Sequence, residues 1–274
     1  WSQTGTRTQY RQTSNIVALM MDVVPRSKKQ SVIDTLLKDI EEKGNHLDVG
    51  IIGARYILPT LTELGYEDVA YQILTADTYP SWGHMALNGT SLWEMWENTT
   101  RSRDHYFLGT YDQYLFEYLG GVKGMEEGYK TFTLEPNVLG DLAYVNVGLD
   151  TVRGDLESRW TLDENNALVY TVEIPVGSTA TVKLPTAKLD NVQVNGKALR
   201  AAVPGIRDAA VKDGKVTVTA GSGKYVFQTA IDGYKTDKSK LEKAVDTASG
   251  IDSTQYTPAG AALLAEKLNA AKKV

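Results

Sequence analysis

Apolar residues recur every three or four positions along the first 122 residues, the spacing that places them on one face of a helix. This spacing predicts helices over five segments, 9–23, 28–42, 51–64, 66–75 and 105–119. Pro25, Gly44 and Gly120 stand where three of these helices end. Helices of this length joined by short turns are typical of stacked antiparallel hairpins, so residues 1–122 are predicted to form an all-α domain.

The connection between residues 77 and 104 is the exception among these turns. Helices of a bundle are usually joined by about two to eight residues, and much longer loops are usually functional. The sequence therefore predicts that the functional site lies in this connection.

Residues 123–233 change to an alternation of apolar and polar positions, which is typical of half-buried strands. Turn residues such as Asn195-Gly196 and Asp213-Gly214 separate the strand segments. About eight strands at this spacing indicate an antiparallel β-sandwich. The predicted strands are 130–134, 142–147, 157–162, 168–174, 180–184, 191–194, 216–220 and 224–228.

The last segment, residues 234–274, returns to helical spacing. One amphipathic helix is predicted over 237–248, and a second begins after Thr257, with Pro258 in its first turn. Two helices alone rarely bury enough surface to be stable, so these are predicted to dock on the sandwich or on a further helix.

Composition narrows the class of protein. The chain has 274 residues, a net charge of −5 and no cysteine. The acidic balance argues against a nucleic-acid partner, and no apolar run is long enough to cross a bilayer. The absence of cysteine excludes disulfides and thiolate chemistry, and no metal or other cofactor is expected.

The long connection concentrates residues suited to sugars. Trp82, Trp93 and Trp96 fall within fifteen residues, with His84 in the same span and His105 shortly after it. Aromatic rings can stack on the apolar faces of sugars, while histidine and carboxylates bind hydroxyl groups. Glycoside hydrolysis also needs carboxylates, and this stretch contains two, Glu94 and Glu97.

Plainer interpretations apply to several of these residues. Packing is the favoured role for Trp96, and at least one of Glu94 and Glu97 is expected to be a solvated surface acid. His46 follows a helix end and is interpreted as a local structural residue. A zinc site built from His46, His84, His105 and Glu94 is not favoured, because the spacings match no common ligand pattern.

The run "YPSWGHMALNGTSLWEMWENTTRSRDHYFLGTYDQYLFEYLGG" resembles the catalytic domain of bacterial α-L-rhamnosidases, glycoside hydrolase family 78. The segments "RQTSNIVALMMDVVP" and "HLDVGIIGARYILPTLTELGYEDVAYQIL" resemble helices of the same family's barrel. Downstream, "FTLEPNVLGDLAYVNVGLDTVRGDLESRW" resembles the start of its C-terminal β-sandwich. The resemblance covers roughly residues 6–230.

The resemblance implies an (α/α)6 barrel, a β-sandwich and hydrolysis of terminal α-L-rhamnosyl groups with inversion. It assigns the general base to Glu94, a sugar contact to His105 and a wall of the sugar pocket to Trp82; we also expect Trp93 to contact the sugar. Asp104 stands where the family usually has Asn, which puts the hydroxyl contacts of that segment in question.

The resemblance also implies what the chain lacks. About half of a twelve-helix barrel fits into residues 1–122, and nothing matches the family's general acid. Glu97 is no substitute, because it lies too close to Glu94 in sequence to stand across the sugar. The missing N-terminal half of the barrel is therefore an expected partner. Without it, the chain alone is expected to be inactive and to expose an apolar surface, so that it either loses order in its first helices or associates through that surface. Trp82, Glu94 and His105 are expected to line one solvent-open end of the helical layer.

The tail "DKSKLEKAVDTASGIDSTQYTPAGAALLAEKLNAAKKV" resembles a partial FIVAR-type helical repeat of bacterial surface proteins, which implies a secreted or wall-associated protein. The predicted organisation is thus half of the barrel over 1–122, the sandwich over 123–233 and the partial repeat over 234–274. Its expected substrate is a rhamnose-containing glycan or glycoside, with no nucleic acid and no membrane. Two alternatives stay open: a non-catalytic surface module that binds glycans or a partner, and another (α/α)6-barrel carbohydrate enzyme.

Overall fold

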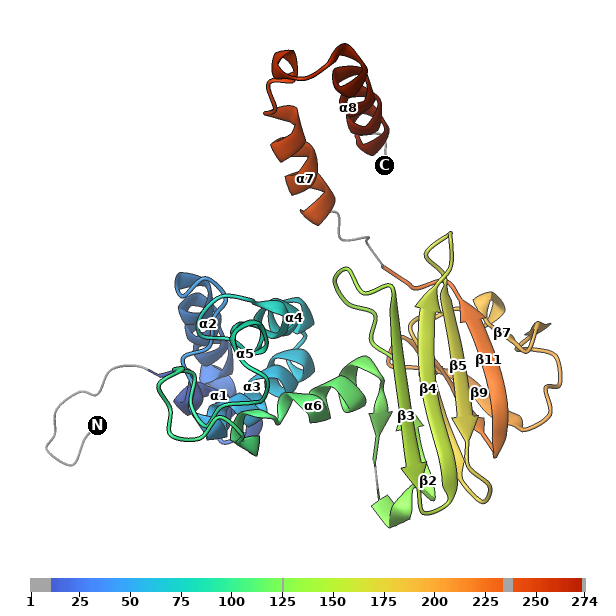
Figure 1. Ribbon diagram of the computed structural model, residues 1–274. Coiled ribbons are helices and arrows are strands. Elements are labelled where there is room, and N and C mark those ends of the chain that lie inside the picture. The colour runs from blue at the N-terminus through green and yellow to red at the C-terminus, as the bar shows by residue number, and fades with distance from the viewer. Residues whose placement is uncertain (1–10, 125, 234–238, 273–274) are drawn as a thin grey trace, which may run out of the picture. The chain divides into compact units, whose positions relative to one another are not determined.

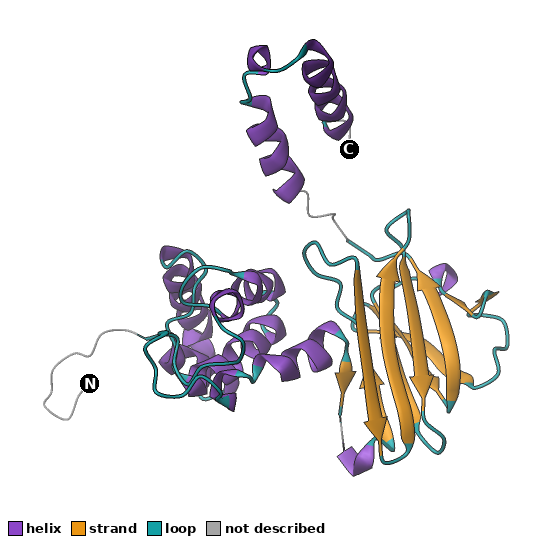
Figure 2. Cartoon of the chain, viewed as in Figure 1, coloured by secondary structure: helices purple, strands orange, loops and turns teal. Residues whose placement is uncertain are grey.

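The computed structural model describes residues 11–124, 126–233 and 239–272. The chain divides into two compact units, the first ending at Asp232 and the second beginning at Gly233. Helices come first in the larger unit and strands follow (Figure 2). The predicted helix starts at residues 9 and 237 lie outside the described residues.

Four helices form the first part of the larger unit: α1 (Gln12–Met20), α2 (Arg26–Glu42), α3 (Ile51–Glu63) and α4 (Glu67–Thr75). Helix α3 packs against both α1 and α4. Its buried side chains, including Ala54, Ile57, Leu58 and Leu61, recur every three or four positions along one face. Gly53 allows the close approach to α1, since a Cβ there would lie 2.5 Å from the Thr13 Oγ1 atom. These helices agree with the predicted segments to within a few residues.

The predicted helix over 105–119 is wrong as a single element. The segment contains a 3-10 turn, η1 (Tyr106–Leu108), then α6 (Tyr111–Tyr114) and a π-helical turn, η2 (Leu115–Leu119). Gly109 separates the first two, where a Cβ would lie 2.9 Å from Leu92 Cδ1. A further helix, α5 (Trp82–Asn88), lies inside the connection predicted as a loop. Seven residues are too few to show a helical period.

Eleven strands within the described residues form two sheets (Figure 1). The five-stranded sheet has the order β1-β2-β6-β10-β9, and the six-stranded sheet has the order β3-β4-β5-β11-β7-β8. The strands are β1 (Val122–Lys123), β2 (Thr131–Leu134), β3 (Tyr144–Thr151), β4 (Gly154–Leu162), β5 (Leu168–Ile174), β6 (Thr179–Leu184), β7 (Gln193–Val194), β8 (Lys197–Ala198), β9 (Ile206–Lys212), β10 (Lys215–Ala220) and β11 (Gly223–Thr229).

The sandwich prediction is confirmed with two differences. Strands β2 and β6 pair in parallel, because the chain visits the other sheet between them; every other pairing is antiparallel. Strands β1, β8 and β9 were not predicted. The first two have only two residues each, and the side chains of β9 are mostly exposed, so that strand shows no alternation.

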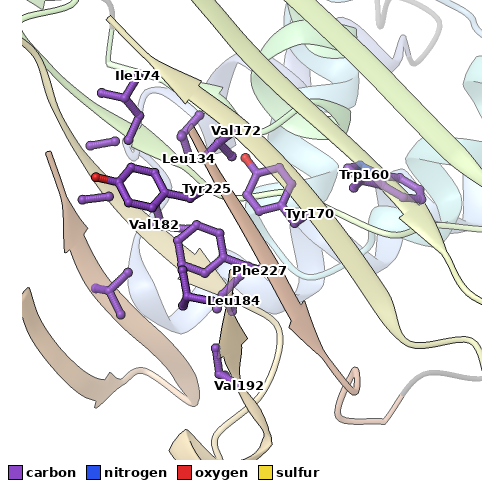
Figure 3. Packing of buried hydrophobic residues seen from close by; sticks show 14 of the residues in the cluster. Leu134, Trp160, Tyr170, Val172, Ile174, Val182, Leu184, Val192, Tyr225 and Phe227 are labelled. Atoms are coloured by element: carbon purple, nitrogen blue, oxygen red, sulfur yellow. The ribbon is translucent and has the colours of Figure 1, made fainter. Parts of the chain in front are cut away.

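The sandwich core follows from the alternation of its strands. In β5, Leu168, Tyr170, Val172 and Ile174 point inward. Phe227 of β11 lies beside Tyr170 (Figure 3). Burying one such side chain stabilises the fold by about 1.5–3 kcal/mol. Residues of both sheets belong to this one cluster, so a single core joins the two sheets.

Two hydrogen bonds join the last helical turn to the sandwich. The Trp160 Nε1 atom donates to the Leu119 carbonyl oxygen at 3.0 Å, and the Ser158 hydroxyl donates to the Gly120 carbonyl oxygen at 2.5 Å. Carbonyl groups at a helix end lack partners within the helix. Side chains of β4 therefore satisfy the end of η2.

The smaller unit contains α7 (Ser239–Ser249), a 3-10 turn η5 (Ser253–Gln255) and α8 (Pro258–Ala271). Thr257 caps α8 as predicted, with its hydroxyl accepting from the Gly260 amide at 3.3 Å. Within the described residues, no helix has the length and apolar character needed to cross a membrane.

Candidate functional site

Helix α5 holds the first half of the long connection in place. The Ser81 hydroxyl caps the helix by accepting from the His84 amide at 3.0 Å. Gly83 lies against the preceding turn, and a Cβ there would be 2.4 Å from the Ala76 carbonyl oxygen. The peptide between Tyr79 and Pro80 is cis. The Tyr79 ring lies edge-on to the ring of His84 in the first turn of α5, with centroids 5.6 Å apart.

The second half of the connection folds back on itself between residues 91 and 105. The Glu94 amide donates to the Ser102 carbonyl oxygen at 3.1 Å, and the His105 amide donates to the Leu92 carbonyl oxygen at 2.9 Å. The Ser91 hydroxyl adds a bond to the Arg103 carbonyl oxygen. We call this segment, residues 91–105, the Glu94 hairpin. Its backbone bonds fix Glu94 and His105 on neighbouring arms.

Trp82 and Trp93 are buried in the helical core, with exposed fractions of 5% and 1%. Trp82 donates to the Leu108 carbonyl oxygen at 2.6 Å. Trp93 packs on Gly89, where a Cβ would lie 2.7 Å from its Nε1 atom, and Arg103 lies over its ring. Rings this buried offer no open face for stacking. The structure therefore does not support the expectation that Trp82 and Trp93 contact the sugar, or that Trp82 is open to solvent.

Trp96 packs as expected. Its ring lies edge-on to Trp82 with centroids 5.5 Å apart, and its Nε1 atom donates to the Val49 carbonyl oxygen at 2.7 Å. This bond joins the Glu94 hairpin to the segment before α3. His46 also agrees with its interpretation, since its Nε2 atom lies 2.7 Å from the Thr78 hydroxyl and its Nδ1 atom 2.7 Å from the Gly44 carbonyl oxygen.

Glu94 and His105 are half-buried. Within the described part of the chain, no side chain forms a hydrogen bond or an ion pair with the Glu94 carboxylate. Its oxygens are therefore open to a water molecule or a ligand. The His105 ring packs on Phe107 with centroids 4.0 Å apart, and Tyr106 beside it is largely exposed. Among the described residues, no group of three histidine or acidic side chains is arranged to hold a metal ion.

A cavity of about 410 Å³ lies where the starts of α1 and α3 meet the segment before α5 and the Glu94 hairpin. Tyr79 and Trp96 supply aromatic surface, and Arg11, Asp48 and Glu97 supply charge. Arg11 forms an ion pair with Asp48. Such a mixture of rings and charged groups suits a polar ligand with apolar faces.

Trp96 and Glu97 of this cavity were noted in the sequence, whereas other lining residues, Tyr79 and Asp48 among them, were not. The available signal was position, since both stand just before a helix of the hairpin stack. Burial raises the pKa of the Tyr79 hydroxyl, and the charge of Glu97 raises it further. Tyr79 thus remains a hydrogen-bond donor at neutral pH. Glu97 is exposed, as expected for at least one of the two acids, and it also lines this cavity.

Family comparisons match both parts of the larger unit. Residues 1–119 match the bacterial alpha-L-rhamnosidase six-hairpin glycosidase domain, and residues 121–199 match the bacterial alpha-L-rhamnosidase C-terminal domain. Up to residue 199, the chain belongs to the bacterial α-L-rhamnosidase family. The matches confirm the predicted fold class of a partial (α/α)6 barrel followed by a β-sandwich.

Individual α-L-rhamnosidases agree with this assignment. One from Formosa agariphila is 33% identical over 224 residues, which cover 78% of this chain and 23% of the relative. One from Streptomyces avermitilis is 28% identical over 228 residues, covering 79% of this chain and 21% of the relative. The chain therefore spans about a quarter of the length of such relatives.

Solved α-L-rhamnosidase structures share the fold. The enzyme from Dictyoglumus thermophilum aligns with a TM-score of 0.72 and 33% identity, over 81% of this chain and 25% of that one. The Streptomyces avermitilis enzyme complexed with L-rhamnose aligns with a TM-score of 0.70 and 27% identity, over 80% of this chain and 21% of that one. The tail from residue 234 lies outside both family matches.

Proposed function

We propose that this chain is part of an inverting α-L-rhamnosidase in which Glu94 is the general base. The observation that carries the proposal is the free carboxylate of Glu94 in the matched glycosidase domain, held half-buried by the backbone bonds of the Glu94 hairpin. The family of the chain and the names of its relatives support the reaction class.

In this proposal the ionised Glu94 accepts a hydrogen bond from a water molecule. As the water oxygen attacks the anomeric carbon, Glu94 takes the released proton. The leaving oxygen receives a proton from a second carboxyl group on the other side of the sugar, about 6.5–9.5 Å from the base. We propose that this general acid lies outside the 274 residues, since no residue of the chain resembles it.

The substrate is proposed to be a glycan or glycoside with a terminal α-L-rhamnosyl group. The Streptomyces avermitilis relative was solved with L-rhamnose, which supports rhamnose as the recognised sugar. His105 would contact the ring hydroxyls, and its packing on Phe107 would hold the imidazole in one orientation. Trp82, Trp93 and Trp96 would act through the backbone they position, because their rings are buried or half-buried.

The test is Glu94→Gln in the full-length protein, assayed with an aryl α-L-rhamnoside. Because a positioned base contributes about 10²–10⁴-fold, kcat is expected to fall by that factor while rhamnose still binds. Glu97→Gln tests the rival carboxylate at the cavity, and Glu41→Gln, on the exposed side of α2, is the matched control. A larger loss of kcat for Glu97→Gln than for Glu94→Gln would show that Glu94 is not the general base.

The product's configuration tests the mechanism separately. Proton NMR during the first turnovers is expected to show the β-anomer of L-rhamnose, because water attacks from the face opposite the leaving group. Initial release of the α-anomer would contradict inversion. The 274-residue chain alone is expected to show no turnover near ordinary glycosidase rates.

The smaller unit supports a proposal about location. We propose that α7 and α8 form part of a FIVAR-like repeat of a secreted or wall-associated protein, on the resemblance of the tail and the Thr257 cap at the start of α8. Fractionation of the source cells tests this, and recovery of the protein in the cytoplasm alone would contradict it.

A further inference from the structure

Lysines surround one carboxylate on the five-stranded sheet, far along the chain from the Glu94 hairpin. The Lys215 ammonium lies 2.8 Å from one oxygen of Glu135, and those of Lys183 and Lys123 lie 3.3 and 3.6 Å from the other. The Glu135 side chain is only 16% exposed. Together with Lys212, these residues form what we call the lysine cluster: Lys123, Lys183, Lys212 and Lys215.

Strand alternation places the lysine cluster on the outer face of this sheet. Val182 and Leu184 of β6 point into the core, so Lys183 between them points outward. Lys215 pairs with Lys212 across the hairpin between β10 and β9. The Asp213-Gly214 turn, with positive φ at both residues, closes that hairpin and keeps the two lysines opposite each other.

A cavity of about 410 Å³ opens among these side chains. Lys183, Lys212 and Lys215 line it together with Thr181 and Thr217, and Glu135 and Asp213 contribute the acidic groups. Thr217 pairs with Lys183 across β10 and β6, so the hydroxyl and the ammonium belong to the same row of the sheet. In the described residues, the hydroxyls of Thr181 and Thr217 have no hydrogen-bond partner. The cavity thus combines ammonium groups with free hydroxyl donors.

The lysine cluster has more charge and more donors than Glu135 can satisfy. Three ammonium groups share one carboxylate, and each ammonium has three N–H donors. Lys212 has no ion-pair partner within the described part of the chain. Burial raises the pKa of Glu135, but the hydrogen bond from Lys215 and the charges of the lysines lower it by more, so Glu135 stays ionised and orients the ammonium groups.

We propose that this cavity binds an oxyanion, the sulfate or carboxylate group of an acidic sugar chain. Ammonium groups from three strands would contact the anion's oxygens, and the threonine hydroxyls would donate to the same oxygens or to the sugar. That the anion belongs to a sugar chain rests on the proposed function. The anion-binding site itself rests on the lysine cluster alone. The site would hold a charged residue of the glycan apart from the rhamnosyl group that is cleaved.

The experiment measures binding calorimetrically at low salt with the full-length protein. The probes are inorganic sulfate, a sulfated trisaccharide, a uronic acid trisaccharide and a neutral trisaccharide, all without rhamnose, so that the Glu94 site does not respond. The acidic trisaccharides are expected to bind more tightly than sulfate, and the neutral one not at all. Added salt is expected to weaken the binding.

The double variant Lys183→Gln/Lys212→Gln is expected to weaken binding of the acidic trisaccharides by about tenfold or more, because charged hydrogen bonds are lost. The matched control, Lys197→Gln/Lys224→Gln, removes the same charge from the other sheet and is expected to change nothing. Lys212→Gln alone keeps the ion pairs of Glu135 intact. If the double variant is unstable, this single variant tests the site instead, and it is expected to weaken binding of the acidic trisaccharides severalfold.

Three outcomes would overturn the proposal. The anion site fails if no anionic probe binds saturably, or if the control variant weakens binding as much as the lysine variant does. If sulfate binds tightly and the acidic trisaccharides bind no more tightly than sulfate, the proposal that the anion belongs to a sugar chain is wrong. None of these results depends on turnover, so they are distinguishable from a failure of Glu94→Gln.

Discussion

The Glu94 hairpin and the sandwich are held together in different ways. In the sandwich, long ladders of backbone bonds set the register, and alternating side chains fill one core. The hairpin has few backbone bonds of its own. Indole groups take their place, with Trp82 donating to the Leu108 carbonyl oxygen and Trp96 to that of Val49. Tryptophans that suggested a sugar platform instead support the backbone that carries Glu94.

This difference has a consequence for the cost of mutations. A change in the sandwich core acts on a cluster shared by both sheets, so the whole larger unit should respond. A change in the hairpin removes a local support, so the loop should loosen before the rest of the molecule. The following predictions test this contrast in the 274-residue chain, from the largest expected effect to the smallest.

Trp160→Ala is expected to destabilise the chain most. Trp160 is fully buried and donates to the Leu119 carbonyl oxygen, so the change leaves both a cavity and an unpaired acceptor. The expected loss is about 3–5 kcal/mol in the free energy of unfolding, measured with denaturant. Val152→Ala, at a residue that is 90% exposed, is the control. Equal effects of the two changes would contradict the single shared core.

Gly89→Ala is expected to cost about 1–3 kcal/mol through overpacking. The new Cβ would lie 2.7 Å from the Trp93 Nε1 atom and 3.2 Å from the Met85 carbonyl oxygen. Hydrogen exchange should then show weaker protection of the Glu94 and His105 amides, with the sandwich unchanged. Gly148→Ala is the control, since a Cβ there meets nothing within 4 Å. Uniform loss of protection across both regions would show that the hairpin is not a local unit.

Trp96→Phe keeps an aromatic ring but removes the bond to the Val49 carbonyl oxygen. The expected loss is about 1 kcal/mol, the net contribution of one hydrogen bond. Protection of the Glu94 amide should fall because the hairpin loses its tie to the segment before α3. If that amide exchanges at the unchanged rate, the indole bond does not position the hairpin.

The smallest expected effect is a pH dependence that originates in the sandwich. Because the pKa of Glu135 is lower in the folded chain than in the unfolded one, its stabilisation is present above the unfolded pKa, about 4.3. It is lost as the pH falls through the lower, folded value. Denaturation below pH 5 should therefore show a shallower loss of stability for Glu135→Gln than for the unaltered chain. A steeper loss of stability for Glu135→Gln would contradict a lowered pKa of Glu135 in the folded chain.

Periodicity predicted the fold where burial follows a regular period. Strand β5 lies where its alternation placed it, and α2 differs from its predicted segment by two residues at its start. Strand β9 was missed because its side chains are mostly exposed and its register shifts near Asp208, which has a φ of +57°. Hydrophobic periodicity does not reveal such a strand, because its position depends on pairing with β10.

The family was easier to predict from the sequence than the burial of single residues. The length of the connection drew attention to the region around Glu94, and the pattern there indicated the family. Burial of Trp82 and Trp93 depends on contacts with distant segments, such as the Leu108 carbonyl oxygen, and composition does not report those contacts. The role of Glu94 stays a prediction until the variants are measured.

The bonds that join η2 to β4 bear on how such enzymes can be recombined. The two family matches meet at Gly120, which makes this position a natural cut for exchanging modules between enzymes. Physically it is a poor cut, because the carbonyl groups of Leu119 and of Gly120 itself accept bonds from Trp160 and Ser158. A hybrid spliced here would keep its fold only if the incoming sandwich supplied an indole and a hydroxyl at the same two places. The boundary between sequence modules is thus a shared interface, and the two halves are expected to change together in evolution.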